Sequence, residues 1–500
     1  MDLAQAEKLL SGTLAADGAG RPQEVLAQLD EVLASCRGSN VAAARACAVR
    51  ALERKAAVLY DLGLPEDSVE ALNEMIGIGQ VDDAPAVTVM VLAALLSKGI
   101  ILRDLGEPEA ALAVWDDLLG RYRGDPASRS GDAVIQALEE RAYALWTIGR
   151  WQQAVAACDE LLACAAATSD PEARRREAWA LFVKGAALNE LGQHEAALTE
   201  LDRLFARYGN APSESVREYI ARGLQAQAAA YRGLGSTKRQ LAVLEELTRR
   251  FVASADPNIT TFVSVAFYDQ ARCLLALGDE RRALVRYKAF ADRARSSTDP
   301  EVRWKFARAA MRRAALLARR GALEDALSVL DEAAGDPGVV ETLGPNDWAK
   351  LMLDRTQALL AVERPAEAIL AAAAVVERLA AADDDPETRK LISRALLAKI
   401  AILGNVGRIP ESEADMELLI EDFAEDALAA LDDDIEQYSG TTDRFNRKTL
   451  AITLSSKAGI LKGLERDPEA KAVFRQLINE FQNVKDPKLV VLVAHAREQL

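Results

Sequence analysis

The chain has little of what enzymes commonly use. It has two histidines, His194 and His495, in 500 residues, so a catalytic histidine pair or a histidine metal site is almost excluded. The sequence has no phosphate-binding GxxxxGK[ST] loop, no CxxC pair, no HExxH and no GxSxG. Acid pairs such as Asp116 with Asp117 are neighbours on one helix and diverge by about 100°, which favours a structural role. We therefore expect no enzyme activity, no metal and no cofactor.

Other features that the sequence lacks bear on its cellular location and its class of partner. The N-terminus has no basic start followed by an apolar core, and runs such as residues 86–96 are too short to cross a bilayer. The five cysteines are odd in number and scattered, which suits a reducing compartment. A formal charge of −16 argues against nucleic acid or a membrane as the main partner. We expect a soluble, cytoplasmic protein.

Half of the residues are apolar and 5% are aromatic, which favours close helix packing over sheets. A repeat then sets the architecture. The residue that closes each Leu-Gly pair, called the anchor below, recurs every 43 residues over its first eight copies. The anchors are Gly20, Gly63, Gly106, Gly149, Gly192, Gly235, Gly278, Gly321, Glu363, Gly407 and Glu465.

Each unit carries the same helical stripe. Large apolar residues stand eleven and four residues before nearly every anchor, and a small residue stands seven before most of them, as at Gly99 and Gly185. A second small residue follows five after the anchor, as at Ala111 and Ala197. Asp-Pro pairs 21 or 22 residues before an anchor predict capped first helices of about 20 residues. The pattern predicts two packed helices per unit.

The stretch Lys184–Leu198, KGAALNELGQHEAAL, resembles the tetratricopeptide repeat in its small residue, its Leu-Gly and its Glu-Ala-Leu. The resemblance covers nearly the whole chain and is closest to bacterial versions, although the usual unit has about 34 residues. It implies an all-α, right-handed α-solenoid of about eleven antiparallel helix pairs. We expect the solenoid over residues 1–485, with an insertion at about 425–448, and a C-terminal capping helix over 486–500.

A basic residue stands eight before most anchors, and an acid often follows 18 residues later on the second helix. We predict that these residues pair inside each unit and orient its two helices. The pattern is absent at Arg355 and Lys457, which we expect to be available for other contacts. The expected pairs are Lys98 with Asp116, Arg141 with Asp159, Lys184 with Asp202, Arg313 with Asp331, and Lys399 with Glu417.

The resemblance implies a partner groove lined by the first helices. Two readings remain open for the aromatic residues there, a pocket or packing between units. The basic stretch from Arg303 to Arg320 either attracts an acidic peptide or is solvated, and the acidic region 407–436 could neutralise it or join subunits into a homo-oligomer. The family's clamp for a terminal carboxylate is not supported, because its positions hold residues such as Phe182 and Ala186. The candidate partner-binding residues are Tyr143, Trp146, Trp179, Phe182, Tyr268, Arg272, Arg308 and Arg312.

These observations lead to one main hypothesis, a non-catalytic scaffold or adaptor that binds a protein or peptide in its groove. The alternative is a regulatory or sensor subunit of a bacterial signalling or defence complex whose catalytic part lies on another chain. In either case the partner is a protein, which can belong to a larger complex.

Overall fold

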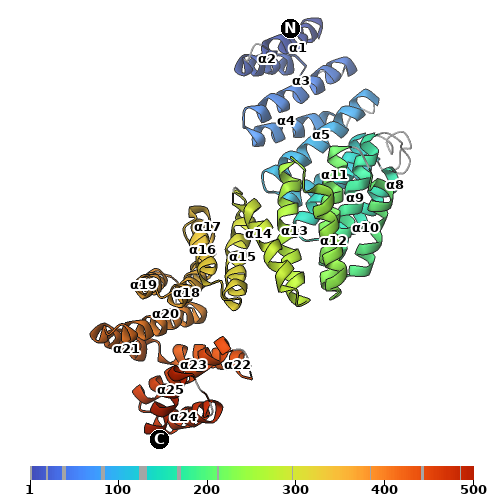
Figure 1. Ribbon diagram of the computed structural model, residues 1–500. Coiled ribbons are helices and arrows are strands. Elements are labelled where there is room, and N and C mark those ends of the chain that lie inside the picture. Colours follow the sequence, from blue (N-terminus) through green and yellow to red (C-terminus); the bar gives the residue numbers. More distant parts are fainter. Residues whose placement is uncertain are drawn as a thin grey trace. The chain divides into compact units, whose positions relative to one another are not determined.

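The structure is a computed structural model that describes residues 3–18, 21–36, 41–79, 85–122, 132–165, 171–210, 213–295, 297–382, 385–440, 444–482, 484 and 486–500. Over these ranges the secondary structure is helical, with 25 helices and no strand (Figure 1). The predicted all-α fold of antiparallel helix pairs is therefore confirmed. None of the described helices is both long and apolar enough to span a membrane.

The helices alternate between two kinds. The first helices are α1 (Leu3–Gly18), α3 (Ala42–Asp61), α5 (Pro85–Asp104), α7 (Asp132–Thr147), α9 (Pro171–Glu190), α11 (Glu214–Gly233), α13 (Pro257–Ala276), α15 (Pro300–Arg319), α18 (Pro345–Ala361), α20 (Pro386–Asn405), α23 (Arg444–Gly463) and α25 (Pro487–Glu498). The second helices are α2 (Pro22–Cys36), α4 (Pro65–Gly79), α6 (Pro108–Tyr122), α8 (Trp151–Ala165), α10 (His194–Tyr208), α12 (Thr237–Phe251), α14 (Glu280–Ala294), α16 (Leu323–Ala334), α19 (Pro365–Leu379), α21 (Ile409–Asp422) and α24 (Asp467–Phe481).

Two helices fall outside this alternation. The short helix α17 (Pro337–Thr342) follows α16 and packs against α15. Helix α22 (Ala424–Tyr438) fills most of the segment where the sequence predicts an insertion, and it packs against α20 and α23. Its 15 residues match the usual length of a second helix.

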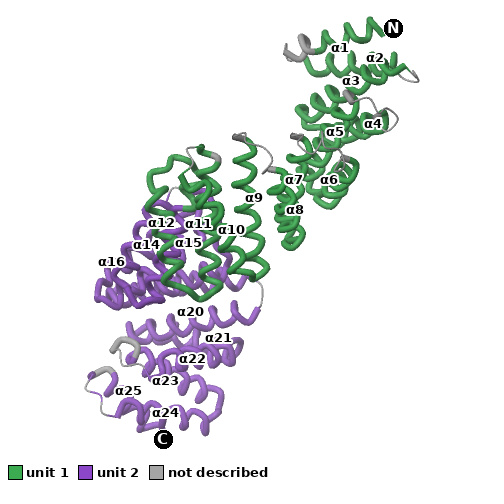
Figure 2. Tube along the Cα trace, turned by 90° about the vertical axis from the view of Figure 1, so that its right-hand side faces the viewer, with its two compact units in different colours: residues 1–262 green, residues 263–500 purple. Residues whose placement is uncertain are grey.

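The chain divides into two compact units, residues 1–262 and 263–500 (Figure 2). Within each unit, a first helix packs against its own second helix and against the second helix of the preceding pair. In unit 1, for example, α9 contacts both α8 and α10. In unit 2, α18 contacts both α16 and α19. Each unit is thus a stack of helix pairs in which every pair buries its apolar stripe on its neighbours.

The anchors form the turn between the two helices of a pair. The eight described anchor glycines have φ between 66° and 81°, and Glu363 and Glu465 take the same left-handed conformation at 60° and 59°. Glycine adopts this conformation without a steric penalty, which explains its recurrence. Gly20 lies outside the described residues.

The small residues allow the two helices of a pair to approach closely. A Cβ atom added at Gly99 would lie 2.2 Å from Trp115 Nε1, and one added at Gly185 would lie 2.7 Å from Leu201 Cγ. Trp115 and Leu201 are both fully buried. The second helices contribute their own buried small residues, such as Ala111 and Ala197. The glycines and the bulky residues opposite them therefore fit as matched pairs.

The predicted Asp-Pro caps are present where the structure describes them. Asp299 accepts hydrogen bonds from the backbone N–H groups of Glu301 and Val302 at the start of α15. Asp385 does the same at the start of α20, and Asp256 at the start of α13. The fourth predicted cap, Asp170, lies outside the described residues.

Candidate interaction surface

The first helices of unit 1 bring three of the predicted aromatic residues together. The ring centroids of Tyr143 and Trp146 on α7 lie 6.1 Å apart, and those of Trp146 and Phe182 on α9 lie 6.4 Å apart. Tyr143 is 39% exposed and Trp146 is half-buried, whereas Trp179 and Phe182 are buried. Trp179 and Phe182 are therefore part of the buried core, whereas Tyr143 and part of Trp146 are accessible.

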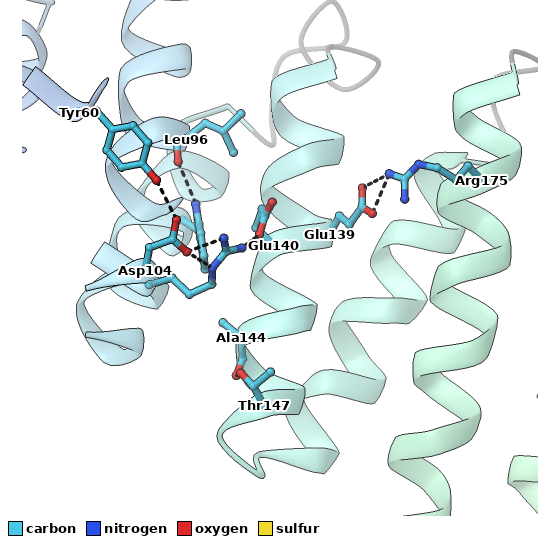
Figure 3. A network of polar contacts seen from close by, with 10 residues as sticks. Tyr60, Leu96, Asp104, Glu139, Glu140, Ala144, Thr147 and Arg175 are labelled. Carbon is cyan, nitrogen blue, oxygen red and sulfur yellow. Dashed lines mark hydrogen bonds and ion pairs between the residues drawn. The ribbon is translucent and has the colours of Figure 1, made fainter. Parts of the chain in front are cut away.

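A polar network lies beside Tyr143 and includes the Tyr60 hydroxyl and Asp104 (Figure 3). Arg103 on α5 donates to Asp104 Oδ1 through its Nε and Nη2 atoms at 3.0 and 2.8 Å, and it also pairs with Glu140 on α7. Its guanidinium lies 5.7 Å from the centroid of the Tyr143 ring. The Tyr60 hydroxyl donates to Asp104 Oδ2 at 3.3 Å, so the network joins α3, α5 and α7.

In this network, Arg103 pairs with two carboxylates, those of Asp104 and Glu140. Burial raises the pKa of Glu140, and Arg103 acts in the opposite direction. A second pair lies nearby, in which Arg175 Nη2 on α9 donates to Glu139 Oε1 at 2.8 Å, and Arg175 Nη1 bonds the Tyr219 hydroxyl at 3.0 Å (Figure 3). Unit 1 therefore presents aromatic rings among satisfied charges. The sequence pattern missed this network, although Tyr60 and Arg103 both stand three residues before an anchor.

In unit 2, the predicted residues gather around Tyr287. The buried Tyr268 ring lies 5.9 Å from Tyr287 and 5.4 Å from Phe290 on α14. Arg272 lies 6.0 Å above the Tyr268 ring, with 54% of its side chain exposed, and it pairs loosely with Asp269 at 3.4 Å. Burial raises the pKa of Tyr287 to about 12, while Arg272 and Arg312 act to lower it. The two arginines thus lie in the same neighbourhood.

The two remaining predicted arginines, Arg308 and Arg312, lie on α15. Arg308 lies 4.7 Å above the Trp304 ring, whose Nε1 donates to Asp347 Oδ2 on α18 at 2.9 Å. Arg312 is exposed. Neither arginine has a carboxylate of the described residues within ion-pair distance. Other bases of the same stretch are paired, Arg303 with Asp336 at 2.6 Å, Arg319 with Glu280 at 2.9 Å, and Lys305 with Glu301.

A carboxyl group that sequence reasoning missed lies next to Arg312. Asp354 on α18 is half-buried, and burial raises its pKa to about 6 in spite of the opposing effect of Arg312. It has no hydrogen bond to a described residue. Asp354 and Arg312 both stand nine residues before their anchors, and this shared register could have revealed their proximity.

None of the five predicted ion pairs is present among the described residues, because Arg141 and Lys184 reach back to the preceding second helix, Lys399 pairs with a different acid of its own second helix, and Lys98 and Arg313 have no partner there. Arg141 pairs with Asp116 at 2.7 Å, and Lys184 pairs with Asp159 at 2.7 Å. Such a pair joins two successive repeats, not the two compact units, and its residues are 24 or 25 apart in the sequence. It is called an inter-unit pair below. The others are Lys55 with Asp30 at 2.6 Å, Arg355 with Asp331 at 2.6 Å, and Lys457 with Asp432, while Gln227 donates to Asp202 at 2.9 Å.

The physical reason is that the first helix lies in the seam between two second helices. The base eight residues before the anchor therefore lies within reach of the second helix of the preceding repeat. The ninth residue of that second helix is the acid that pairs with it. Two bases pair with an acid of their own second helix, 16 residues later rather than 18. Lys184 contacts Glu200 at 2.8 Å in addition to Asp159, and Lys399 contacts Asp415 at 2.9 Å. Arg355 and Lys457, which we expected to be available, are both paired.

The acidic region 407–436 is largely engaged within unit 2. Three acids of α22 pair with bases of α20: Asp426 with Arg389 at 2.8 Å, Asp433 with Lys390 at 2.9 Å, and Asp434 with Arg394 at 2.6 Å. Among the residues that the structure describes, no group of three His, Cys, Asp or Glu side chains could hold a metal ion.

No family model matches the sequence, and no curated protein matches it. Similar solved structures include a tetratricopeptide repeat protein from Parabacteroides merdae, which is 15% identical, with 70% of this chain and 98% of that chain covered and a TM-score of 0.35. The apo form of RapI is 12% identical, with 81% and 99% covered and a TM-score of 0.44. The TPR domain of P58(IPK) is 13% identical, with 82% and 98% covered and a TM-score of 0.26.

The fold class of the protein follows from its own helix pairs. Long first helices, second helices of mostly 15 residues, left-handed anchors and matched small residues make it an α-helical repeat protein with a tetratricopeptide-like fold. Its unit of 43 residues is longer than usual because most of its first helices have 20 residues.

Proposed function

We propose that the chain is a non-catalytic scaffold that binds a protein or peptide on the faces of its first helices. The observation that supports this proposal most directly is the pair Arg308 and Arg312. Neither has a carboxylate of the described residues within ion-pair distance, whereas Arg303, Lys305 and Arg319 of the same stretch are paired. Arginines beside aromatic rings are typical of the residues that dominate protein interfaces.

The charge of this surface favours an acidic segment as the partner. Arg272, Arg308 and Arg312 lie over or near aromatic rings, and an acidic peptide would supply the carboxylates that Arg308 and Arg312 lack. In unit 1, Tyr60 and Tyr143 are 43% and 39% exposed and offer an aromatic counterpart. We infer that unit 2 supplies charge recognition and that unit 1 supplies apolar contact.

Site-specific photocrosslinking in extracts of the native host tests the proposal. The photoreactive residue p-benzoylphenylalanine replaces Arg312 on a first helix or, as a matched control, Leu370, which is 69% exposed on the second helix α19. We expect the probe at 312 to capture discrete protein partners, and Arg308→Glu to reduce that capture at least five-fold. Equal capture of the same proteins at 370, or capture unaffected by Arg308→Glu, would contradict the proposal.

A further inference from the structure

Two bases of the repeat have no acid to pair with. The position eight before the anchor holds eight Lys or Arg residues, and six of them have a carboxylate within ion-pair distance. The two others, Lys98 and Arg313, have no such partner in the described parts of the chain. Both bases are half-buried.

Substitutions at the two acid positions explain both exceptions. The residue 25 before Lys98 is Asn73, and the residue 16 after it is Val114. For Arg313, the corresponding residues are Lys288 and Val329. Both possible sources of an acid are therefore lost at each of these two bases.

The two unpaired bases differ in the space beside them. A hollow of about 370 Å³ lies next to Lys98, between α4, α5 and α6. The hollow next to Arg313 measures about 10 Å³, which is at the lower limit for a single water molecule. A ligand can therefore reach Lys98 but not Arg313.

The lining of the larger hollow combines apolar and polar groups. The exposed Ala113 and the half-buried Val114, together with the buried Ile76 and Leu95, form its apolar part, while the exposed Asn73 lies beside Lys98. Arg121 also borders the hollow and pairs with Asp117 at 2.7 Å. Two bases against one acid leave a net positive charge.

This combination selects a carboxylate attached to an aliphatic group. The carboxylate would accept from the Lys98 ammonium and the Asn73 amide, as Asp30 and Asp116 pair with their own bases. An exposed ion pair contributes about 0 to 1 kcal/mol, so an aliphatic group packed on Ala113 and Val114 must supply the rest of the affinity. A Cβ atom added at Gly77 would meet nothing within 4 Å, which leaves room for a peptide backbone at the rim.

We propose that the hollow beside Lys98 binds a Glu or Asp side chain of a partner protein segment, together with an adjacent aliphatic residue. The partner would supply the carboxylate that the repeat places there in other units. This site lies between second helices α4 and α6 and is separate from the arginine surface of unit 2. It does not depend on the function proposed for that surface.

The probe for this site is fluorescein-labelled N-acetyl-Leu-Glu-Leu-amide, titrated with the full chain by fluorescence anisotropy. We expect binding that weakens with added salt, and at least five-fold weaker binding of the Gln analogue. Lys98→Met should reduce affinity at least five-fold. Asn73→Asp should reduce it equally, because the new carboxylate would pair with Lys98 and occupy the site from within.

The matched control is Lys55→Met, which removes the base of a complete inter-unit pair and should leave probe binding unchanged. Asn73→Asp should also raise the Tm of the free protein, which reports independently that the new carboxylate reaches Lys98. Unchanged binding in Lys98→Met or Asn73→Asp, equal loss in Lys55→Met, or no binding at millimolar probe would overturn the proposal. If 4-methylpentanoate competes as well as the unlabelled peptide, the occupant is a small acid and the assignment to a protein partner fails.

Discussion

At the residue scale, the inter-unit pairs make a quantitative prediction about which acid each base contacts. In a double-mutant cycle, Arg141→Met and Asp116→Asn should couple by about 0.5 kcal/mol, the usual size for a partly exposed pair. Lys98→Met and Asp116→Asn should show no coupling. Urea unfolding of the three single variants, the two double variants and the wild type measures both values. A larger coupling for Lys98 than for Arg141 would restore the pairing within units that the sequence pattern suggests.

Asp354 makes a second residue-scale prediction, which concerns pH. Its pKa of about 6 in the folded protein lies above the ordinary value of 3.8, so the folded state binds a proton that the unfolded state releases. The contribution of Asp354 to the free energy of unfolding therefore has its full value below pH 4 and is lost as the pH rises through 6. The loss amounts to roughly 3 kcal/mol at most.

Asp354→Asn tests this sign directly. The variant should be more stable than the wild type at pH 7 and nearly equal to it at pH 4, as measured by urea unfolding at both values. Arg312→Ala should raise the pKa of Asp354 further, because Arg312 favours the charged carboxylate. Equal stability differences at both pH values would contradict the assignment.

At the element scale, the anchor turns test the cost of the left-handed conformation. Glu363 has φ of 60° at a turn where eight of the other described anchors are glycine. Glu363→Gly should stabilise the protein by about 1 kcal/mol, because a side chain with Cβ is strained there. Glu363→Ala is the control and should give no such gain, since alanine keeps the Cβ atom. Thermal unfolding of the two variants separates relief of strain from loss of the glutamate.

The elements themselves were largely predictable, because anchors, stripes and Asp-Pro caps each have a local signature. The contacts between successive repeats were less predictable. The offset between Lys98 and Asp116 looks as regular in the sequence as that between Arg141 and Asp116, and only packing decides between them. For the same reason, the pattern placed Trp179 and Tyr143 on one face but could not tell that Trp179 is buried and Tyr143 exposed. Burial at a seam depends on the neighbouring unit, which one repeat's sequence does not contain.

At the scale of the whole molecule, stability should be local, because a helix pair contacts mainly its neighbours along the chain. The test uses Gly99, where an added Cβ would overlap the buried Trp115. Gly99→Ala should cost about 1 to 3 kcal/mol through overpacking, more than the gain of about 1 kcal/mol in helix propensity. Amide hydrogen exchange followed by mass spectrometry shows which helices lose protection in this variant.

We expect faster exchange in α4 to α7 and unchanged exchange in α18 to α20, since units beyond the nearest neighbours share no core with Gly99. Trp115→Cys added to Gly99→Ala should restore protection, because it provides the room that the new Cβ atom needs and reproduces the pair of Ala142 and Cys158 in the next repeat. A uniform increase over the whole chain would mean that the repeats unfold as one cooperative body. In that case, the two-unit division would have no counterpart in stability.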